Sequence, residues 1–317
     1  MKHDRGLTLV EVLIAMLLVL VACAGALALV ARGRAAQRTS ESVARLEETT
    51  DAALSILVEE LRLAGYLGLA APGSPVAGAS LIGTAEAPGL AVAGGCGNSL
   101  AHDLGSPVSA ADGAYRVSAS TPLRCSAGPN GRSVAGSDTL TLRHASAAAT
   151  QAARGRLQLE TSLRAARLIT DGTRQYGDRG RIHDLEVGVF YISADSTAQR
   201  GWPSLRRKRL VGGTRPAFQD EELVTGIEDL QVEIGLDAAD DQDSAVDRWV
   251  TPAEISGADV ARAVRLWIRA RSDLQENPAL DQAALRYANR DVPREPVRYR
   301  RQLSSRIVEL RNLQGSP

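Results

Sequence analysis

The feature that most constrains this chain is an uncharged, mostly apolar run near its N-terminus, from Val12 to Ala31. Only Gly25 in this run is a poor helix former. A helix of about twenty residues is about 30 Å long, which is the thickness of the hydrocarbon core of a bilayer. The sequence therefore predicts that one helix of this chain spans a membrane.

A single carboxylate, Glu11, lies at the start of this helix. An acidic side chain costs about 2.5 to 3.5 kcal/mol at the centre of a membrane helix, and less near the interface. If the chain is cut after Gly6, Leu7 becomes the N-terminus, and the freed α-amine of a neighbouring helix can neutralise Glu11. We interpret Glu11 as a group that sets the register between helices. The alternative is a plain signal anchor whose acid extends toward water.

The segment Lys2–Glu11, KHDRGLTLVE, and the apolar helix after it resemble the class III signal of type IV pilins and type II secretion pseudopilins. The resemblance implies that a prepilin peptidase cuts after Gly6 on the cytoplasmic side and that Leu7 is N-methylated. It also implies that Glu11 registers the subunit. Leu7 replaces the phenylalanine that is more usual at this position.

The charges that flank the helix predict a different orientation from the one that the resemblance implies. Three arginines, Arg32, Arg34 and Arg38, follow the helix directly. By charge counting alone, this arginine-rich side would be cytoplasmic. Because a prepilin peptidase site must face the cytoplasm, the resemblance instead implies a single-pass inner-membrane protein with a cytoplasmic N-terminus and a periplasmic head.

The segment Thr39–Leu63 repeats apolar residues at helical spacing, with charged residues between them. This pattern predicts an amphipathic continuation of the membrane helix that ends at Gly65. A separate core helix would need a break after Ala31, and Gly33 is the only candidate breaker. We therefore expect one long helix, bent at Gly33.

Residues 65–136 are rich in glycine, alanine, serine and proline, which predicts loops with short regular elements. This segment holds Cys96 and Cys125, whereas Cys23 lies in the membrane helix. In an oxidising compartment we expect Cys96 and Cys125 to form a disulfide, and two free thiols are the alternative. Closing a loop of about thirty residues would contribute about 3 to 4 kcal/mol.

Alternating apolar residues from Ser137 onward predict a β-rich head domain, residues 137–317. The expected strands lie in Thr139–Arg143, Leu185–Ser193, Arg207–Val211, Leu230–Leu236, Val264–Arg271 and Val297–Leu310. The predicted fold class is α+β, with a mostly antiparallel sheet packed on the amphipathic half of the long helix. The expected divisions are a leader at 1–6, a transmembrane and polymerisation helix at 7–31, an amphipathic helix at 32–64, loops at 65–136 and the head.

Several later segments extend the resemblance over most of the chain. They are GYLG at 65–68, SDTLTLRHA at 137–145, LVTGIEDLQVEIGLD at 223–237, VRLWIRAR at 264–271 and YRRQLSSRIVELRN at 299–312. In this order they resemble the PilW family of minor type IV pilins. The resemblance implies a minor pilin that helps to assemble a type IV pilus in a tip-located priming complex. A minor pseudopilin at the tip of a type II secretion pseudopilus is the alternative.

The resemblance also implies a set of partners. They are other minor pilins, the major pilin, prepilin peptidase, the inner-membrane assembly platform, a tip adhesin and the inner membrane itself. The formal net charge is zero, and the basic runs at 206–209 and 264–271 are typical of solvated faces, so we expect no nucleic-acid partner.

No catalytic constellation, cofactor motif or metal-ligand spacing emerges from the sequence, so we expect neither an enzyme nor a cofactor. The acidic run from Asp237 to Asp247 has enough oxygen ligands for calcium. It lacks the glycine and the terminal glutamate of an EF-hand loop, and we interpret it as a solvated turn.

Overall fold

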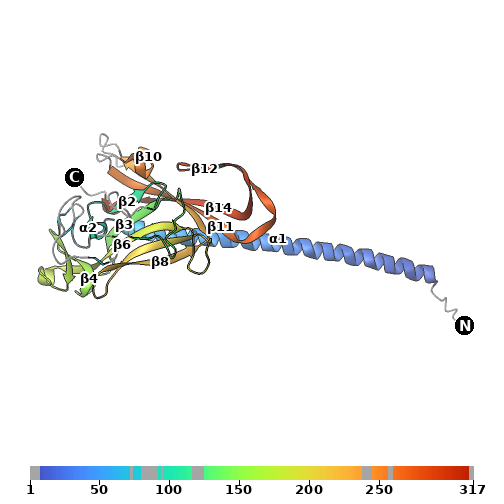
Figure 1. Cartoon of the computed structure of the whole chain (residues 1–317), viewed down its shortest axis with the longest axis horizontal. Coiled ribbons are helices and arrows are strands. Elements are labelled where there is room, and N and C mark those ends of the chain that lie inside the picture. The colour runs from blue at the N-terminus through green and yellow to red at the C-terminus, as the bar shows by residue number, and fades with distance from the viewer. Residues whose placement is uncertain are drawn as a thin grey trace. The chain divides into compact units, whose positions relative to one another are not determined.

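The computed structural model describes residues 8–71, 74–79, 92–93, 96, 98–115, 125–237, 245–255 and 260–313. The chain divides into two compact units, Met1–Arg45 and Leu46–Pro317. Both units contain part of the first helix, α1 (Leu9–Leu63), which is labelled in Figure 1. The expected long helix is therefore confirmed, and its C-terminal turn leads to Gly65, whose φ of 79° is the left-handed conformation common after helix ends.

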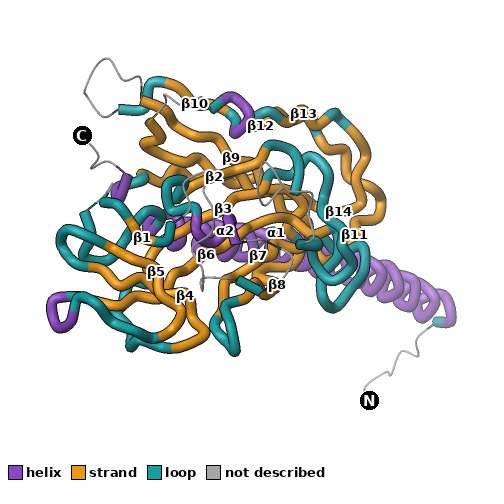
Figure 2. The backbone as a smooth tube through the Cα atoms, turned by 60° about the vertical axis from the view of Figure 1, so that its left-hand side comes forward, coloured by secondary structure: helices purple, strands orange, loops and turns teal. Residues whose placement is uncertain are grey.

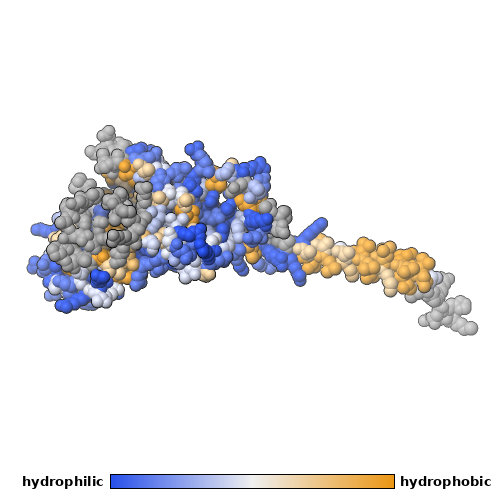
Figure 3. All heavy atoms as spheres, in the orientation of Figure 1, coloured by the Kyte–Doolittle hydropathy of each residue, from blue (hydrophilic) through white to orange (hydrophobic). Residues whose placement is uncertain are grey.

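The first unit exposes the apolar run. Every described side chain from Thr8 to Arg34 is exposed, including Leu20, which is 67% exposed. Figure 3 shows this part of α1 as a continuous hydrophobic surface. Among the described residues, α1 is the one helix that is long and apolar enough to cross a membrane.

The second unit contains the amphipathic part of α1. Its buried apolar residues recur every three or four positions, as the sequence pattern predicts, and are Leu46, Ala53, Leu54, Leu57 and Leu61. Thr50 lies among them, and its hydroxyl donates to the carbonyl of Leu46 at 2.6 Å. This face of the helix is the centre of the largest hydrophobic core.

The first sheet is eight-stranded and antiparallel, apart from one parallel pair between β1 and β5. Its strands are β1 (Val76–Ala77), β2 (Val108–Ala111), β3 (Thr139–Ala145), β4 (Arg154–Thr161), β5 (Ala166–Asp171), β6 (Arg181–Ser193), β7 (Ser204–Val211) and β8 (Ala217–Thr225). The long strand β6 pairs with β4 over its first residues and with β3 and β7 further along. The main order is β1-β5-β4-β6-β3-β2, and β7 joins β6 to β8.

The second sheet has four antiparallel strands in the order β10-β9-β11-β14. Its strands are β9 (Ile227–Asp237), β10 (Arg248–Val250), β11 (Val260–Gln282) and β14 (Glu295–Glu309). A separate hairpin, β12 (Leu285–Tyr287) and β13 (Arg290–Val292), connects β11 to β14. The sequence pattern led us to expect one sheet. The strands divide because Gly226 alone separates β8 from β9, and its φ of 82° turns the chain sharply from one sheet into the other.

Both sheets pack on the amphipathic part of α1 within the second unit (Figure 2). From the first sheet, the core receives Phe190 and Ile192 of β6 and Leu205 of β7. From the second sheet it receives alternate residues of β9 and β11, including Val232 and Leu266. Alternation along β6 places Val189 on the opposite face, in a smaller cluster with Leu100 and Cys125.

The regular elements in the described part of the segment 65–136 are short, in keeping with its glycine- and proline-rich composition. Besides β1 and β2 the segment forms a short helix, α2 (Asn98–His102). Beyond this segment, the sequence pattern did not predict the strands β4, β5 and β8 or the hairpin β12–β13. The remaining elements are three 3-10 turns, η1 (Gly177–Arg179), η2 (Pro252–Glu254) and η3 (Arg311–Leu313).

Candidate functional site

The start of α1 holds the candidate assembly residue. Thr8 precedes the helix, and both its backbone N–H and its hydroxyl donate to Oε2 of Glu11, at 2.9 and 3.0 Å. The backbone N–H of Glu11 donates in return to the Thr8 hydroxyl at 3.3 Å. This reciprocal arrangement is a capping box, which satisfies N–H groups that the first helical turn leaves unpaired. Glu11 is therefore held at the helix start, where the helix dipole favours a negative charge.

Sequence reasoning singled out Glu11 but missed Thr8. The signal was present, because a threonine three residues before a glutamate, ahead of an apolar run, is the usual pattern of a capping box. Within the described residues, the second carboxylate oxygen of Glu11, Oε1, receives no hydrogen bond. Gly6 and Leu7 lie outside the described residues, so cleavage and methylation at these positions stay predictions.

The end of α1 is joined to the first sheet by a charged cluster around Glu60. Its Oε2 lies 3.0 Å from Nε2 of His144 in β3, and its Oε1 accepts a hydrogen bond from Arg207 of β7 at 2.7 Å. Burial acts to raise the pKa of Glu60 and to lower that of His144. Their hydrogen bond and opposite charges outweigh burial, so the pKa of Glu60 is lowered and that of His144 is raised.

The basic run of β7 is neutralised on both faces of the strand. On one face, Arg206 pairs with Asp220 at 2.6 Å, and Lys208 pairs with the same carboxylate at 3.2 Å. On the other face, Arg207 pairs with Glu221 at 2.5 Å in addition to Glu60. Asp220 and Glu221 lie on the neighbouring strand β8, directly opposite Lys208 and Arg207 in the pairing register, whereas Arg206 reaches Asp220 diagonally.

The arginines of β11, which we expected on a basic outer face, are also paired. Arg265 lies 3.3 Å from Glu233 on β9, and Arg269 lies 3.5 Å from Glu228. The Arg271 guanidinium lies over the rings of both Trp202 and Tyr299, 4.1 and 4.6 Å from their centroids. These side chains are half-buried and form part of the packing between strands.

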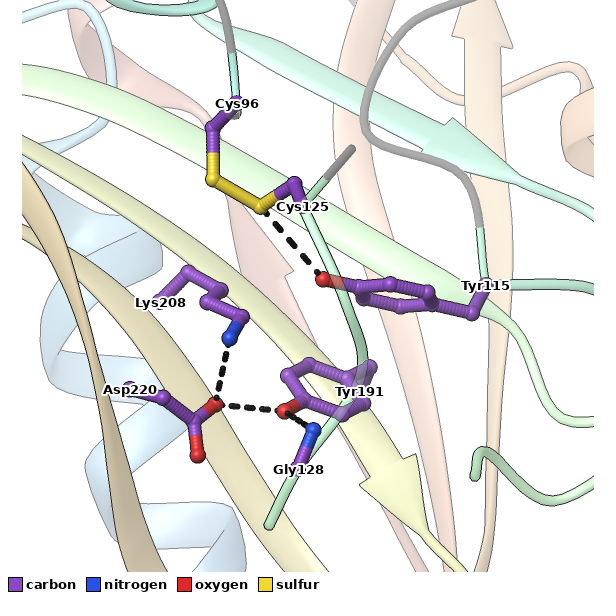
Figure 4. Close-up of a disulfide and its surroundings, with 7 residues drawn as sticks. All are labelled: Cys96, Tyr115, Cys125, Gly128, Tyr191, Lys208 and Asp220. Atoms are coloured by element: carbon purple, nitrogen blue, oxygen red, sulfur yellow. Dashed lines mark hydrogen bonds and ion pairs between the residues drawn. A yellow bond between two sulfur atoms is a disulfide. The ribbon is translucent and has the colours of Figure 1, made fainter. Parts of the chain in front are cut away.

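The loop segment is pinned by the disulfide between Cys96 and Cys125, which confirms the expected pairing (Figure 4). The hydroxyl of Tyr115 donates to Sγ of Cys125 at 3.7 Å. The disulfide packs against Val189 of β6 and Leu100 of α2. It therefore holds the loops on the face of the first sheet that is turned away from α1.

A polar cluster lies next to the disulfide (Figure 4). The backbone N–H of Gly128 donates to the Tyr191 oxygen at 2.6 Å, and the Tyr191 hydroxyl donates to Asp220 at 2.5 Å. The Tyr191 ring lies 4.4 Å from that of Tyr115, measured between centroids. Burial and the nearby Asp220 charge raise the pKa of Tyr191 above its ordinary value, so this tyrosine remains a hydrogen-bond donor.

Two further buried charges hold the loops to the strands. Arg143 of β3 donates to the carbonyl oxygens of Leu100 and Ser106, at 2.7 and 2.6 Å, and burial lowers its pKa to about 10. Asp138, just before β3, accepts from the backbone N–H groups of Gly113 and Val232 at 2.7 and 2.8 Å. Since Val232 belongs to β9, Asp138 links the two sheets.

The carboxyl group of Asp138 is a weaker acid than an ordinary aspartate. Burial raises its pKa to about 7, and the charges of Asp112 and Asp229 act in the same direction, while the two backbone N–H groups oppose the rise. At neutral pH this carboxyl is therefore close to its midpoint of ionisation.

The acidic run that we considered for calcium is only partly described. Asp237 accepts a hydrogen bond from Arg262 at 2.7 Å, so it is engaged within β9 and β11. Asp240, Asp241 and Asp243 lie outside the described residues. Over the part of the chain that the structure describes, no group of three or more acidic, histidine or cysteine side chains could hold a metal ion.

Comparison with known proteins gives two family matches. The model of Type IV Pilus-assembly protein W matches residues 189–312, and the model of the prokaryotic N-terminal methylation motif matches residues 1–27. Among solved structures, a type IV-like pilin from Thermus thermophilus aligns with 13% sequence identity and a TM-score of 0.27, over 51% of this chain and 85% of that pilin. No curated protein matches the chain.

Proposed function

Since residues 189–312 belong to the type IV pilus-assembly protein W family and residues 1–27 carry the prokaryotic N-terminal methylation motif, we propose that this chain is a minor pilin. It acts in a tip-located priming complex with other minor pilins and the major pilin. The observation that carries the proposal is the composition of α1. Its first part is exposed and apolar with one carboxylate at its start, and its second part belongs to the core of a folded head.

In this proposal a prepilin peptidase cuts after Gly6, and the new N-terminus, Leu7, is N-methylated. Before assembly, α1 holds the subunit in the inner membrane, with the N-terminus in the cytoplasm and the head in the periplasm. The further partners are the inner-membrane assembly platform and a tip adhesin.

Assembly then moves the apolar part of α1 from lipid into a bundle of similar helices. Its apolar side chains exchange lipid contacts for contacts with one another. Glu11 would be a costly buried charge in such a bundle unless it met a positive group. The capping box occupies Oε2 and leaves Oε1 open, so the α-amine of a neighbouring Leu7 can approach that oxygen without breaking the cap.

The head would select the partners. In the described part of its loop segment, the Cys96–Cys125 disulfide and Arg143 attach the chain to the first sheet, and this attached surface would contact neighbouring subunits. Surface loops held by a rigid scaffold are common sites of recognition.

A minor pseudopilin of a type II secretion system is the second candidate, because the methylation motif at residues 1–27 fits both assemblies. Deletion of the gene separates the two functions. Loss of twitching motility with intact secretion supports the pilus, and the reverse supports the pseudopilus.

Mass spectrometry of the mature N-terminus tests the processing step directly. We expect a chain that begins at methylated Leu7, and a chain that retains Met1 would contradict the proposal. A Glu11→Gln variant tests the register, because it keeps the shape of the side chain and removes the charge. We expect this variant to be cleaved and inserted normally but to assemble poorly, and normal piliation would count against the role of Glu11.

A further inference from the structure

Three arginines follow the uncharged run of α1, and the assembly mechanism described above does not use them. Arg32, Arg34 and Arg38 are all exposed. None of them has an ion pair or hydrogen bond within the part of the chain that the structure describes. The next carboxylate along the helix, Glu41, accepts a hydrogen bond from Gln37 at 3.0 Å instead. With respect to the described residues, these three guanidinium groups are therefore free to bind another molecule.

Their depth along the helix matches the phosphate layer of a bilayer. When the uncharged run Val12–Ala31 fills the hydrocarbon core, Arg32 is the first residue beyond it. At a rise of about 1.5 Å per residue, Arg34 lies about 3 Å and Arg38 about 9 Å further along the axis. The headgroup region is about 5 to 7 Å thick on each side of the core, and long arginine side chains can bend toward it. All three guanidinium groups can therefore reach lipid phosphates.

Their directions around the helix favour lipid over a single protein partner. Successive residues of an α-helix are turned by about 100°, so Arg34 and Arg38 point about 40° apart. Arg32 points about 160° away from Arg34. A neighbouring helix covers one side of α1, whereas lipid headgroups surround it. The arrangement is thus complementary to a surrounding layer of negative charge.

We propose that Arg32, Arg34 and Arg38 form a basic collar that binds the phosphates of anionic phospholipids around α1. A guanidinium group can donate two parallel hydrogen bonds to one phosphate, which makes arginine well suited to this contact. The collar rests on the membrane-anchored state of the proposed function. It resists extraction of the helix, because these contacts must break when α1 leaves the bilayer for the filament.

The test measures lipid selectivity of the full-length chain in phosphatidylcholine bilayers. Electron spin resonance with spin-labelled phosphatidylglycerol or phosphatidylcholine gives the fraction of each lipid bound to the protein, and hence their relative association constant. One basic group near an anionic surface contributes a factor of about five. We therefore expect the wild type to prefer phosphatidylglycerol at least several-fold. Replacing all three collar arginines by glutamine should bring the ratio close to one.

A matched control removes the same charge from the head. Arg154, Arg164 and Arg179 are exposed in the second unit, and their joint replacement by glutamine should leave the lipid ratio unchanged. Loss of the preference in this control would assign lipid binding to the head and overturn the collar.

The remaining outcomes separate this inference from the proposed function. The collar is overturned if the wild type binds both lipids equally or if the collar variant keeps the lipid preference. The proposed function stands in either case if the chain is still cleaved and assembled. A collar variant that loses assembly but keeps the lipid preference assigns the arginines to a neighbouring subunit and also overturns it. A chain that does not insert into bilayers overturns both the collar and the proposed anchor.

Discussion

The carboxylate of Glu60, in the last turns of α1, lies 3.0 Å from the His144 ring of β3. The same carboxylate accepts a hydrogen bond from Arg207 of β7 at 2.7 Å. The helix is thus attached to the first sheet by charge as well as by its leucine face. Because β3 and β7 pair with opposite edges of β6, this one side chain contacts strands on both sides of the sheet's central strand.

The pair predicts a stability that depends on pH. The pKa of His144 is raised from 6.5, so its contribution is fully present below pH 6.5 and is lost as pH rises through the folded value. The pKa of Glu60 is lowered from 4.5, so its contribution is present above pH 4.5 and is lost as pH falls through the folded value. Both contributions are therefore complete between pH 4.5 and 6.5.

A Glu60→Gln variant should lower the free energy of unfolding by about 1 to 3 kcal/mol in this window, because it weakens two charge-assisted hydrogen bonds. The loss should shrink above the folded pKa of His144. Chemical denaturation at several pH values measures it. Glu59→Gln is the matched control, since Glu59 is exposed one position earlier. A loss that does not vary with pH would contradict the charged pair.

Asp138 predicts a second pH effect, which comes from the burial of a carboxyl group and not from an ion pair. Its pKa is raised from 3.8 to about 7, so the folded head holds this proton more tightly than the unfolded chain does. Stability should therefore fall as pH rises from about 4 to 7, by up to about 4 kcal/mol. Asp138→Asn cannot ionise, so its stability relative to the wild type should improve by up to this amount between pH 4 and pH 8. A constant difference would show that Asp138 ionises normally.

The packing of α1 in the head predicts a large cost for Leu57→Ala. Leu57 is fully buried in the core shared by the two sheets. Its truncation should lower the free energy of unfolding by about 2 to 5 kcal/mol through lost apolar contact and the cavity left behind. Ser55→Ala, on the exposed face of the same helix, should change it by less than about 0.5 kcal/mol. Comparable losses for both variants in thermal unfolding would argue against this face as the core.

The disulfide predicts a measurable contribution from the loop segment. A Cys96→Ser, Cys125→Ser double variant should lose about 3 kcal/mol of stability, because the unfolded chain gains the entropy of an open loop. Cys23→Ser should leave stability unchanged, since Cys23 is an exposed free thiol. Limited proteolysis of the double variant should begin in the released loops. An unchanged cleavage pattern would show that Arg143 and the Tyr191 cluster hold the loops on the sheet without the disulfide.

Local patterns in the sequence were enough to predict several elements. The apolar run, the amphipathic helix ending before Gly65 and the strands around Thr139, Leu230 and Val264 follow from hydrophobic periodicity alone. The strand β8 was missed because its segment is rich in acids and lacks alternation. The acidic side chains of β8 are neutralised by the cations of β7, and the local sequence does not show that these two strands pair.

By itself the sequence determined the long helix, the single carboxylate at its start, the strand-rich head and the cysteine pair, because each depends on the residue types within a short segment. Only the tertiary structure decided that Gly226 splits the strands between two sheets and that Glu60 reaches His144 and Arg207. It also decided that the arginines of β7 and β11 are neutralised by acids on neighbouring strands. The physical reason is the same in each case. Burial and charge pairing depend on which distant residues become neighbours, and that is set by the packing of the whole chain.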